Sequence, residues 1–258
     1  MSVRSANSIV SDLRNIVGDG YIRSDDASLE TYGVDALGKG HPPDVVVLPA
    51  DTQQIAAIAR LCNSERVPLV VRGAGTGFTG GAVPTHGGVL ISMERLNRIL
   101  EIDELNLLAV VEPNVINADL QHAVEKVGLF YPPDPASLNQ CTIGGNVGTG
   151  AGGPRGLKYG VTKDFVLALE IVLANGDVMR TGSRAIKNVT GYNLTQLFVG
   201  SEGTLGVVAE ITLRLIPKPP AKATVMAIYT NLDDACKTVG NVLGAGIEIG
   251  RASCRERV

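Results

Sequence analysis

The sequence predicts an α+β fold, in which helices accompany both parallel and antiparallel strands. Residues 44–72 read as strand, helix and strand, the pattern of a buried parallel pair. Residues 165–181 read as two strands around Asn175 and Gly176, a dipeptide typical of a type I′ hairpin. At 258 residues and 45% hydrophobic, the chain is long enough for one large or two small cores.

Apolar spacing and local stop signals place the other elements. Residues 8–17 have helical spacing and end at Gly18, and Asp51 with Thr52 caps a helix at 53–63. The chain around these reads as strands at 44–48, 68–72, 88–92, 98–103, 107–112 and 207–216, and as a helix at 116–127. Pro217, Pro219 and Pro220 indicate a domain boundary, after which 224–229 reads as a strand and 232–243 as a helix.

Two glycine-rich loops carry the main functional signal. They are VVRGAGTGFTGG at residues 70–81, directly after a strand, and residues 131–160, which hold eight glycines between Gly144 and Gly160. Glycine lets main-chain N–H groups approach a ligand, and runs of such groups form nests that bind phosphate. RGAGTG is not a Rossmann fingerprint, because more glycine and a strand follow it in place of a helix. The two loops together predict one extended ligand.

Composition excludes several classes of protein. A net charge of −3 without a basic stripe argues against nucleic acid or an anionic membrane as a partner. The four cysteines lack the spacing of a zinc site or a disulfide framework, which fits a cytoplasmic setting. No apolar run reaches the roughly 20 residues that span a bilayer, so membrane attachment would need a partner.

Five segments in series resemble the FAD-linked oxidases of the vanillyl-alcohol oxidase type, with a PCMH-type FAD-binding domain. They are VVRGAGTGFTGG, YPPDPAS, CTIGGNVGTGAGGPRGLKYG, KNVTGYNLTQLFVGSEGTLG and ITLRLIPKP, and they span about residues 42–218. Within that family the chain is most similar to the FAD subunit of bacterial glycolate oxidase and to related D-2-hydroxyacid dehydrogenases. The resemblance implies two α+β subdomains with FAD extended between them.

The same resemblance assigns the cofactor-binding residues. Backbone N–H groups of the first loop would bind the pyrophosphate, and the other motifs would line the flavin and the phosphates. The first set is Arg72, Gly73, Ala74, Gly75, Thr76, Gly77, Gly80 and Gly81. The second is Pro133, Asp134, Thr142, Ile143, Gly144, Gly145, Asn146, Thr149, Gly152, Gly153, Glu202, Gly203, Gly206, Val207 and Val208.

Single side chains near these motifs give further expectations. Some members of the superfamily attach the flavin covalently through a His where this chain has Thr76, so the resemblance predicts non-covalent FAD. His41, His86 and His122 lack the neighbouring pattern of a catalytic base. Cys141 is expected to pack as a small buried thiol. Arg155, Lys158 and Lys187 are candidates either for balancing charge near flavin N1 or for ordinary surface roles.

The resemblance predicts the FAD-binding portion of an enzyme that oxidises a D-2-hydroxy acid, of the glycolate or D-lactate class, by hydride transfer to flavin N5. The alternatives are a non-catalytic FAD module or electron-relay subunit, and an alkyl-glycerone-phosphate synthase-like flavoenzyme. An iron–sulfur or other electron-transfer subunit is the implied partner. The catalytic base, and any metal beside it, would lie largely in a C-terminal cap domain, so this chain alone is expected to be inactive.

The expected organisation has four parts. Residues 1–41 form a helical lead, 42–220 the FAD-binding domain with subdomains at about 42–105 and 106–220, and 221–248 the start of a truncated cap domain. Residues 249–258, IGRASCRERV, have no apolar period and match a translated sequencing adapter. They are expected to be a foreign tail.

Overall fold

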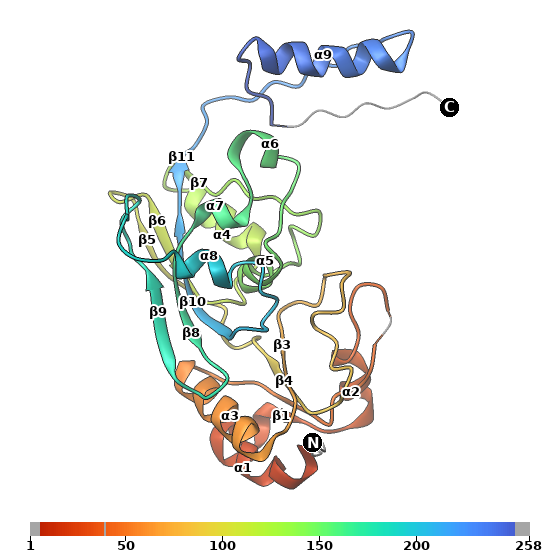
Figure 1. Cartoon of the computed structure of the whole chain (residues 1–258), viewed down its shortest axis with the longest axis vertical. Coiled ribbons are helices and arrows are strands. Elements are labelled where there is room, and N and C mark those ends of the chain that lie inside the picture. The colour runs from red at the N-terminus through yellow and green to blue at the C-terminus, as the bar shows by residue number, and fades with distance from the viewer. Residues whose placement is uncertain (1–5, 39, 251–258) are drawn as a thin grey trace.

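The computed structural model describes residues 6–38 and 40–250, and it arranges them around two sheets and a small third one. The first sheet has the strand order β1-β2-β4-β3, the second β5-β6-β10-β8-β9, and β7 pairs with β11. In Figure 1 the first sheet lies at the bottom, the second above it, and helix α9 (Leu232–Gly244) stands apart at the top. The mixture of helices with parallel and antiparallel strands confirms the α+β prediction.

The first sheet is built from short apolar strands with helices on both faces. Its strands are β1 (Ile22–Arg23), β2 (Val45–Val47), β3 (Leu69–Arg72) and β4 (Val89–Ser92). Its helices are α1 (Val10–Val17), α2 (Asp26–Tyr32) and α3 (Thr52–Glu65), with the short turns η1 (Ala6–Ile9) and η2 (Asp19–Tyr21) beside α1. Asp51 caps α3 as expected, because its carboxylate accepts from the N–H of Gln54 at 2.8 Å.

The strand–helix–strand unit differs from the expected adjacent parallel pair. β2 and β3 each pair in parallel with β4, which lies between them. All four residues of β4 are buried, so this strand takes the central position where both of its edges are hydrogen-bonded. Along β2 the side chains alternate, with Val45 and Val47 in the core under α1 and α3 and Val46 in the small core under α2.

Residues 6–38, 40 and 41 are part of this first unit and not a separate lead. β1 pairs with β2 in antiparallel orientation, and Leu13 and Val17 of α1 belong to the same core as Ile55 of α3. The chain therefore needs its N-terminal helix to cover the sheet.

The second sheet is antiparallel throughout. It contains β5 (Ile99–Asp103), β6 (Leu108–Val111), β8 (Val166–Val172), β9 (Val178–Gly182) and β10 (Val207–Arg214). Around it are α4 (Asn117–Glu125), α5 (Ile143–Thr149), α6 (Gly156–Tyr159), α7 (Thr162–Phe165), α8 (Leu194–Phe198), β7 (Leu129–Phe130) and β11 (Ile216–Pro217). Because β5 pairs with β6, the change of sheet falls between Ser92 and Ile99, earlier than the expected boundary near residue 105.

The two sheets share a core and are joined by polar contacts. Val172, Val207 and Ala209 of the second sheet pack in the core of the first. The Thr52 hydroxyl donates to Glu170 Oε1 at 2.6 Å, and Arg60 Nη2 donates to the carbonyl of Gly176 at 3.0 Å. The end of the β8–β9 hairpin is thus docked on α3.

The turn of that hairpin is not of the expected type I′. Gly176 has φ +81°, whereas Asn175 keeps a negative φ, and a type I′ turn needs positive φ at both. The Gly176 N–H donates to the Leu173 carbonyl and the Leu173 N–H to the Asp177 carbonyl, as in a three-residue loop with a left-handed glycine.

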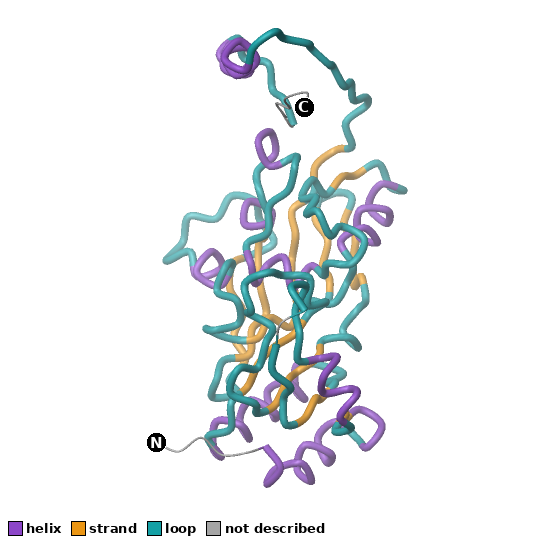
Figure 2. Tube along the Cα trace, turned by 90° about the vertical axis from the view of Figure 1, so that its right-hand side faces the viewer, coloured by secondary structure: helices purple, strands orange, loops and turns teal. Residues whose placement is uncertain are grey.

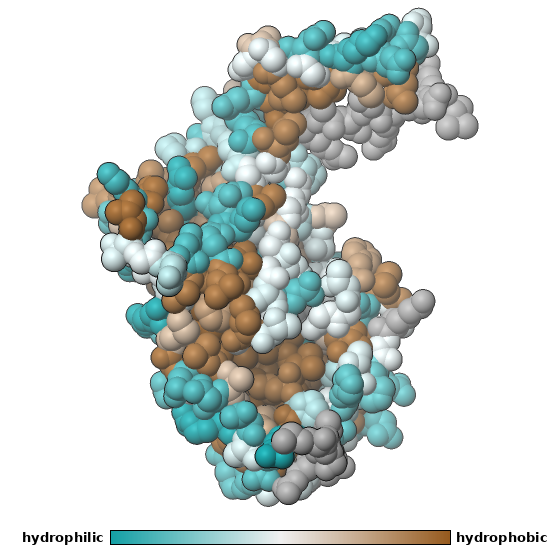
Figure 3. Space-filling model, viewed as in Figure 1, coloured by the Kyte–Doolittle hydropathy of each residue, from teal (hydrophilic) through white to brown (hydrophobic). Residues whose placement is uncertain are grey.

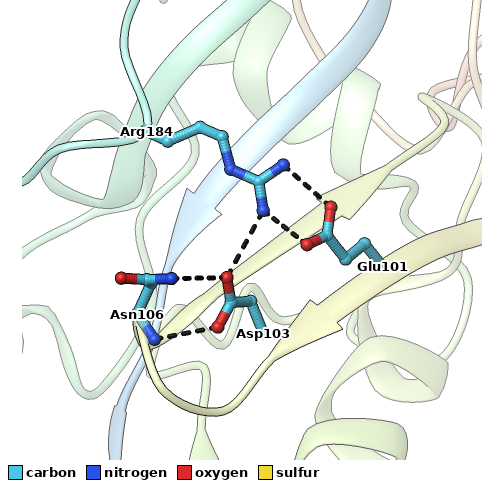
Figure 4. Close-up of polar contacts among 4 residues, drawn as sticks. All are labelled: Glu101, Asp103, Asn106 and Arg184. Atoms are coloured by element: carbon cyan, nitrogen blue, oxygen red, sulfur yellow. Dashed lines mark hydrogen bonds and ion pairs between the residues drawn. The ribbon is translucent and has the colours of Figure 1, made fainter.

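The loop after β9 is tied to the opposite edge of the second sheet by Arg184 (Figure 4). Its guanidinium donates to Glu101 through two nitrogens, at 2.8 and 2.5 Å, and contacts Asp103 at 3.5 Å. Asp103 also accepts from the backbone and side chain of Asn106, and these bonds lower the pKa of Asp103. The side chains of residues 184–193, beyond this anchor, are exposed.

The C-terminal segment departs from the sheets. Helix α9 is confirmed, with Asn231 accepting from the N–H of Asp234 at 2.8 Å. The expected strand at 224–229 does not form, because no described strand lies beside it, and Val225 is 88% exposed. Figure 3 shows hydrophobic residues on the surface below α9. Residues 251–258 of the suspected tail lie outside the described residues, and no helix among the described residues could cross a bilayer.

The docking of the hairpin on α3 gives a stability prediction for Gly176→Ala. A Cβ at this left-handed residue would lie 2.7 Å from the carbonyl oxygen of Ala56, so both the turn and the contact are strained. We expect a loss on the order of 1–3 kcal/mol in the free energy of unfolding, measured with urea. Gly128→Ala is the matched control, because Gly128 is also left-handed, at φ +74°, and its Cβ meets nothing within 4 Å. Equal stability of the two variants would contradict the docking role.

Candidate functional site

The loop that follows β3 is shaped by the side chain that precedes it. The Arg72 guanidinium is half-buried and donates through Nη1 to the carbonyl of Val34 at 2.5 Å. Gly75 has φ +69°, and a Cβ there would collide with this guanidinium. Burial lowers the pKa of Arg72, while Tyr32, Glu94 and Asp35 raise it. Arg72 therefore supports the loop from below.

The backbone of this loop leaves a run of N–H groups without acceptors. From Gly73 to Thr79, no N–H donates a hydrogen bond to any residue of the described chain. Successive unpaired N–H groups in a glycine-rich turn are the donors that form a phosphate-binding nest. Gly80 differs from the expectation, because its N–H already donates to Asp35 Oδ2 at 3.1 Å. The run of open amides thus ends at Thr79.

Helix α5 lies directly against this loop. A Cβ on Gly73 would be 2.6 Å from the Thr142 hydroxyl and 3.7 Å from Gly145 Cα, so only glycine permits the approach. Thr142 caps α5, accepting from the N–H of Gly145 at 3.2 Å. The N–H groups of Ile143 and Gly144 also have protein acceptors, at 2.9 and 2.7 Å. The start of α5 can line a ligand but has no open amide in these positions.

A third segment, residues 200–206, reaches the same place from the second sheet. The N–H of Glu202 donates to the carbonyl of Gly148 at 2.9 Å, and its carboxylate accepts from the Thr79 hydroxyl at 3.1 Å. Glu202 has φ +50°, a left-handed conformation that is uncommon for a non-glycine residue and clusters at functional sites. A Cβ on Gly81 would collide with the Glu202 carboxylate. The two subdomains therefore meet here.

The YPPDPAS segment packs beside α4 and α6. The buried Pro133 gives its carbonyl to Asn117 Nδ2 and Gln121 Nε2, at 3.1 and 2.9 Å. Asp134 accepts from the N–H of Arg155 at 3.0 Å, and a Cβ on Gly153 would collide with the Asp134 carbonyl. This motif braces the second glycine loop, in which the N–H groups of Gly152 and Gly153 have no described acceptor.

The expected site residues divide into two groups. Gly73, Gly81, Thr142, Gly145 and Glu202 converge where the loops of the two sheets meet. Ile143, Asn146 and Val207 have buried side chains that point into protein. Gly206 packs against Ile171, and a Cβ on Gly206 would lie only 2.7 Å from the Ile171 side chain. The Thr149 hydroxyl donates to the Gly145 carbonyl at 3.1 Å. Val208 is half-buried in the second core.

The candidate cations differ in how free they are. Arg155 Nε pairs with Asp134 at 3.3 Å, and its Nη1 is buried without a hydrogen-bond partner among the described residues. Lys158 lies 3.7 Å from Glu248, and Lys187 is exposed. Arg155 is therefore the cation most firmly held beside the glycine loops. Cys141 is 3% exposed, as expected for a packed thiol.

Sequence reasoning missed two residues of the site. Asp35 binds the end of the first loop, and Thr79 bonds Glu202 across the two subdomains. Asp35 stands in no recognisable motif, so nothing local signals its contact with a residue 45 positions later. His41 lies closer to the site than expected. It lines a hollow of about 490 Å³ beside the loop, together with Asp35, Leu37, Phe78 and Val83.

These residues fit a dinucleotide with a pyrophosphate. The open amides of residues 73–79 offer hydrogen-bond donors to a phosphate, and no residue of this run has a charged side chain. Glycine at positions 73 and 81 lets the backbone lie close to α5 and Glu202. Figure 2 shows this face of the molecule covered by loops from both sheets. No cluster of three metal-ligating side chains occurs in the described part of the chain.

Comparison with known proteins gives the same assignment. The model of the FAD binding domain family matches residues 43–182. The glycolate oxidase subunit GlcD of Bacillus subtilis is 54% identical over 205 residues, covering 80% of this chain and 44% of the relative. The D-lactate dehydrogenase of Anaerostipes hadrus is 43% identical over 197 residues, covering 76% and 41%. The chain thus spans less than half the length of either relative.

A solved structure extends the likeness to the fold. p-Cresol methylhydroxylase with bound substrate superimposes with a TM-score of 0.78 at 24% identity, over 93% of this chain and 49% of that one. The superposition bears out the expected fold class, and the family match bears out FAD as the cofactor. The chain belongs to the FAD binding domain family, in the PCMH-type fold.

Proposed function

We propose that this chain holds FAD non-covalently, with the pyrophosphate on the open amides of residues 73–79. The observation that carries the proposal is this run of unpaired N–H groups, in a loop whose conformation is fixed from both sides. Gly81, Thr142, Gly145, Gly152, Gly153, Glu202 and Gly203 would line the cofactor. The side chains of Ile143, Asn146 and Val207 would support the site from the core.

Thr76 is the basis for non-covalent binding. The residue is half-buried within the open loop, and a neutral threonine hydroxyl is a weak nucleophile unless an adjacent base activates it. None of the three histidines lies at positions 73–79, where a ring nitrogen would meet the cofactor. Reversible contacts are therefore what this loop provides.

The protein represented by this chain is proposed to oxidise a D-2-hydroxy acid of the glycolate or D-lactate class. Two relatives carry those substrates in their names, and the first is described as a subunit, which supports an electron-accepting partner chain. Bound FAD supplies a hydride acceptor. The described residues would bind and orient it, with Arg155 held beside the glycine loops as a positive charge.

No histidine of the described residues is placed to act as a base for the substrate hydroxyl. His41, His86 and His122 are all exposed, and His41 and His86 bond the Pro42 carbonyl and the Thr85 hydroxyl. None is paired with a carboxylate that would orient it as a general base. The substrate-binding groups are therefore proposed to lie outside these residues.

Non-covalent binding predicts a specific result in spectroscopy. The purified chain, incubated with FAD and desalted, should retain a yellow flavin spectrum, and acid precipitation should release all of it into the supernatant. Protein that stays colourless after incubation would refute the cofactor proposal. Flavin that remains in the acid pellet would refute only the non-covalent part.

Gly75→Ala should weaken FAD binding through the loop backbone. The Cβ would collide with Arg72 at a left-handed residue, costing on the order of 1–3 kcal/mol of strain, so we expect an affinity about tenfold lower by flavin fluorescence titration. Gly128→Ala is the matched control for affinity and for the unfolding temperature of the FAD-free chain, because Gly128 is also left-handed, lies outside the loop and has nothing within 4 Å of its Cβ. Unchanged affinity in Gly75→Ala would show that the loop does not hold the cofactor.

The absence of a histidine placed as a base among the described residues predicts low turnover. With FAD bound, the chain should reduce a dye with glycolate or D-lactate at least ~100-fold more slowly than the full-length Bacillus relative, since a lost general base costs about that much or more. Rates near those of the relative would mean that the described residues contain the base. Retained FAD with no reduction by any hydroxy acid tested would favour a non-catalytic module.

A further inference from the structure

The segment 34–37, which we call the strap, is bound along the whole first glycine loop. The Val34 carbonyl accepts from Arg72 Nη1 at 2.5 Å, at the start of the loop. The Ala36 N–H donates to the Gly77 carbonyl at 3.2 Å, in its middle. Asp35 Oδ2 accepts from the Gly80 N–H at 3.1 Å, at its end. Three contacts thus fix three points of one loop.

Asp35 is the strongest of these attachments. Its side chain is almost buried, at 9% exposed, and its second oxygen accepts from the N–H of Leu37 at 2.9 Å. A carboxylate that accepts from two backbone N–H groups makes charge-assisted bonds, which are stronger than neutral ones. Asp35 therefore holds the strap and the loop in one geometry at the same time.

The strap follows α2, whose Leu29 and Tyr32 pack against the first sheet, and it is held by the segment that comes after it. Val34 bridges Gly40, and the His41 N–H donates to the Gly33 carbonyl at 3.1 Å. A Cβ on Gly33 would lie 2.6 Å from the His41 carbonyl, so the two passes of the chain are closely packed. The strap is therefore held in place by protein on its far side, independently of the loop.

A loop with glycine at 73, 75, 77, 80 and 81 loses much conformational freedom when it is ordered. If it were free, that cost would be subtracted from the affinity for the ligand, whereas a pre-ordered loop avoids it. The open amides at 73–79 lie between the points that the strap fixes. Asp35 does not bind phosphate, because a carboxylate offers no donor.

We propose that Asp35 is a positioning residue for cofactor binding, which keeps the amides of residues 73–79 pre-ordered for the pyrophosphate. The proposal rests on the proposed function, since it takes FAD as the ligand of this loop. A purely structural Asp35 would affect the stability of the whole chain. A positioning Asp35 affects the loop and the affinity for FAD more than the rest of the molecule.

The test compares Asp35→Asn with the wild-type chain and with Glu30→Gln. The Asn amide can accept from only one of the two N–H groups, whereas Glu30 is exposed and has no hydrogen bond or ion pair with the described residues. Glu30→Gln thus removes the same charge from the neighbouring helix α2. We expect the Kd for FAD to rise about tenfold or more in Asp35→Asn only, as for a lost bond to a charged group.

Hydrogen exchange of the FAD-free chain gives a second readout. Peptides that cover residues 80–88, where the N–H groups of Gly80, Val83 and Gly87 are hydrogen-bonded, should exchange faster in Asp35→Asn, while those that cover β2 and β4 should keep the wild-type rate. If Asp35→Asn does not fold, the comparison is made with Asp35→Glu, which keeps the charge but displaces the carboxylate.

Three results would overturn the inference. One is a Kd within twofold of wild type, another is an equal rise in Glu30→Gln, and the third is faster exchange over the whole chain. A wild-type chain that binds no FAD would remove the proposed function as well, so the two failures are distinguishable.

Discussion

The candidate site depends on the core that the two sheets share. Val172, Val207 and Ala209 belong to strands of the second sheet, but their side chains pack in the core of the first sheet, under α1 and α3. Burial of each of the two valines stabilises by roughly 1.5–3 kcal/mol, and the part-buried hydrogen bonds of Thr52 and Arg60 add to this contact between the sheets. Because this packing fixes the orientation of the sheets, the loops at their ends meet in a defined way.

Where the loops meet, the close packing leaves no space for side chains at several glycine positions. Gly73 against Thr142 and Gly81 against Glu202 leave no room for a Cβ, and Gly144 is equally tight against Pro113 at 2.5 Å. Such close approach of main chains exposes amides without intervening side chains. Glycine in these motifs therefore has two roles, packing between subdomains and presentation of N–H groups.

The helices, most strands and the cofactor could be predicted from the sequence. The way the strands pair in the sheets could not. Helix α3, its Asp51 cap, helix α9 and most strands follow from local spacing and local signals, which do not depend on distant residues. The position of β4 between β2 and β3 is a long-range choice that no local pattern encodes. The strand expected at 224–229 has the right composition, but a strand needs a partner.

The same distinction applies to the site. The glycine motifs predict a nest, but they do not show which of its amides already have acceptors within the protein. The Gly80 N–H donates to Asp35, and the first N–H groups of α5 also have acceptors within the protein. Asp35 and Thr79 become visible only when segments distant in sequence are brought together, whereas Glu202 was expected from its motif and the structure adds its left-handed conformation. Contacts between the two subdomains depend on the tertiary structure, and local sequence patterns do not predict them.

Strand β10 also bears on how the molecule is made. Val207 and Ala209 at its start complete the first core, while Ile211 and Leu213 belong to the second. The first core otherwise consists largely of residues before position 97. During synthesis, which proceeds from the N-terminus, that core waits for more than a hundred further residues before its last side chains emerge. The first core therefore stays incompletely packed until β10 has been synthesised, and the candidate site between the two sheets is among the last parts to be assembled.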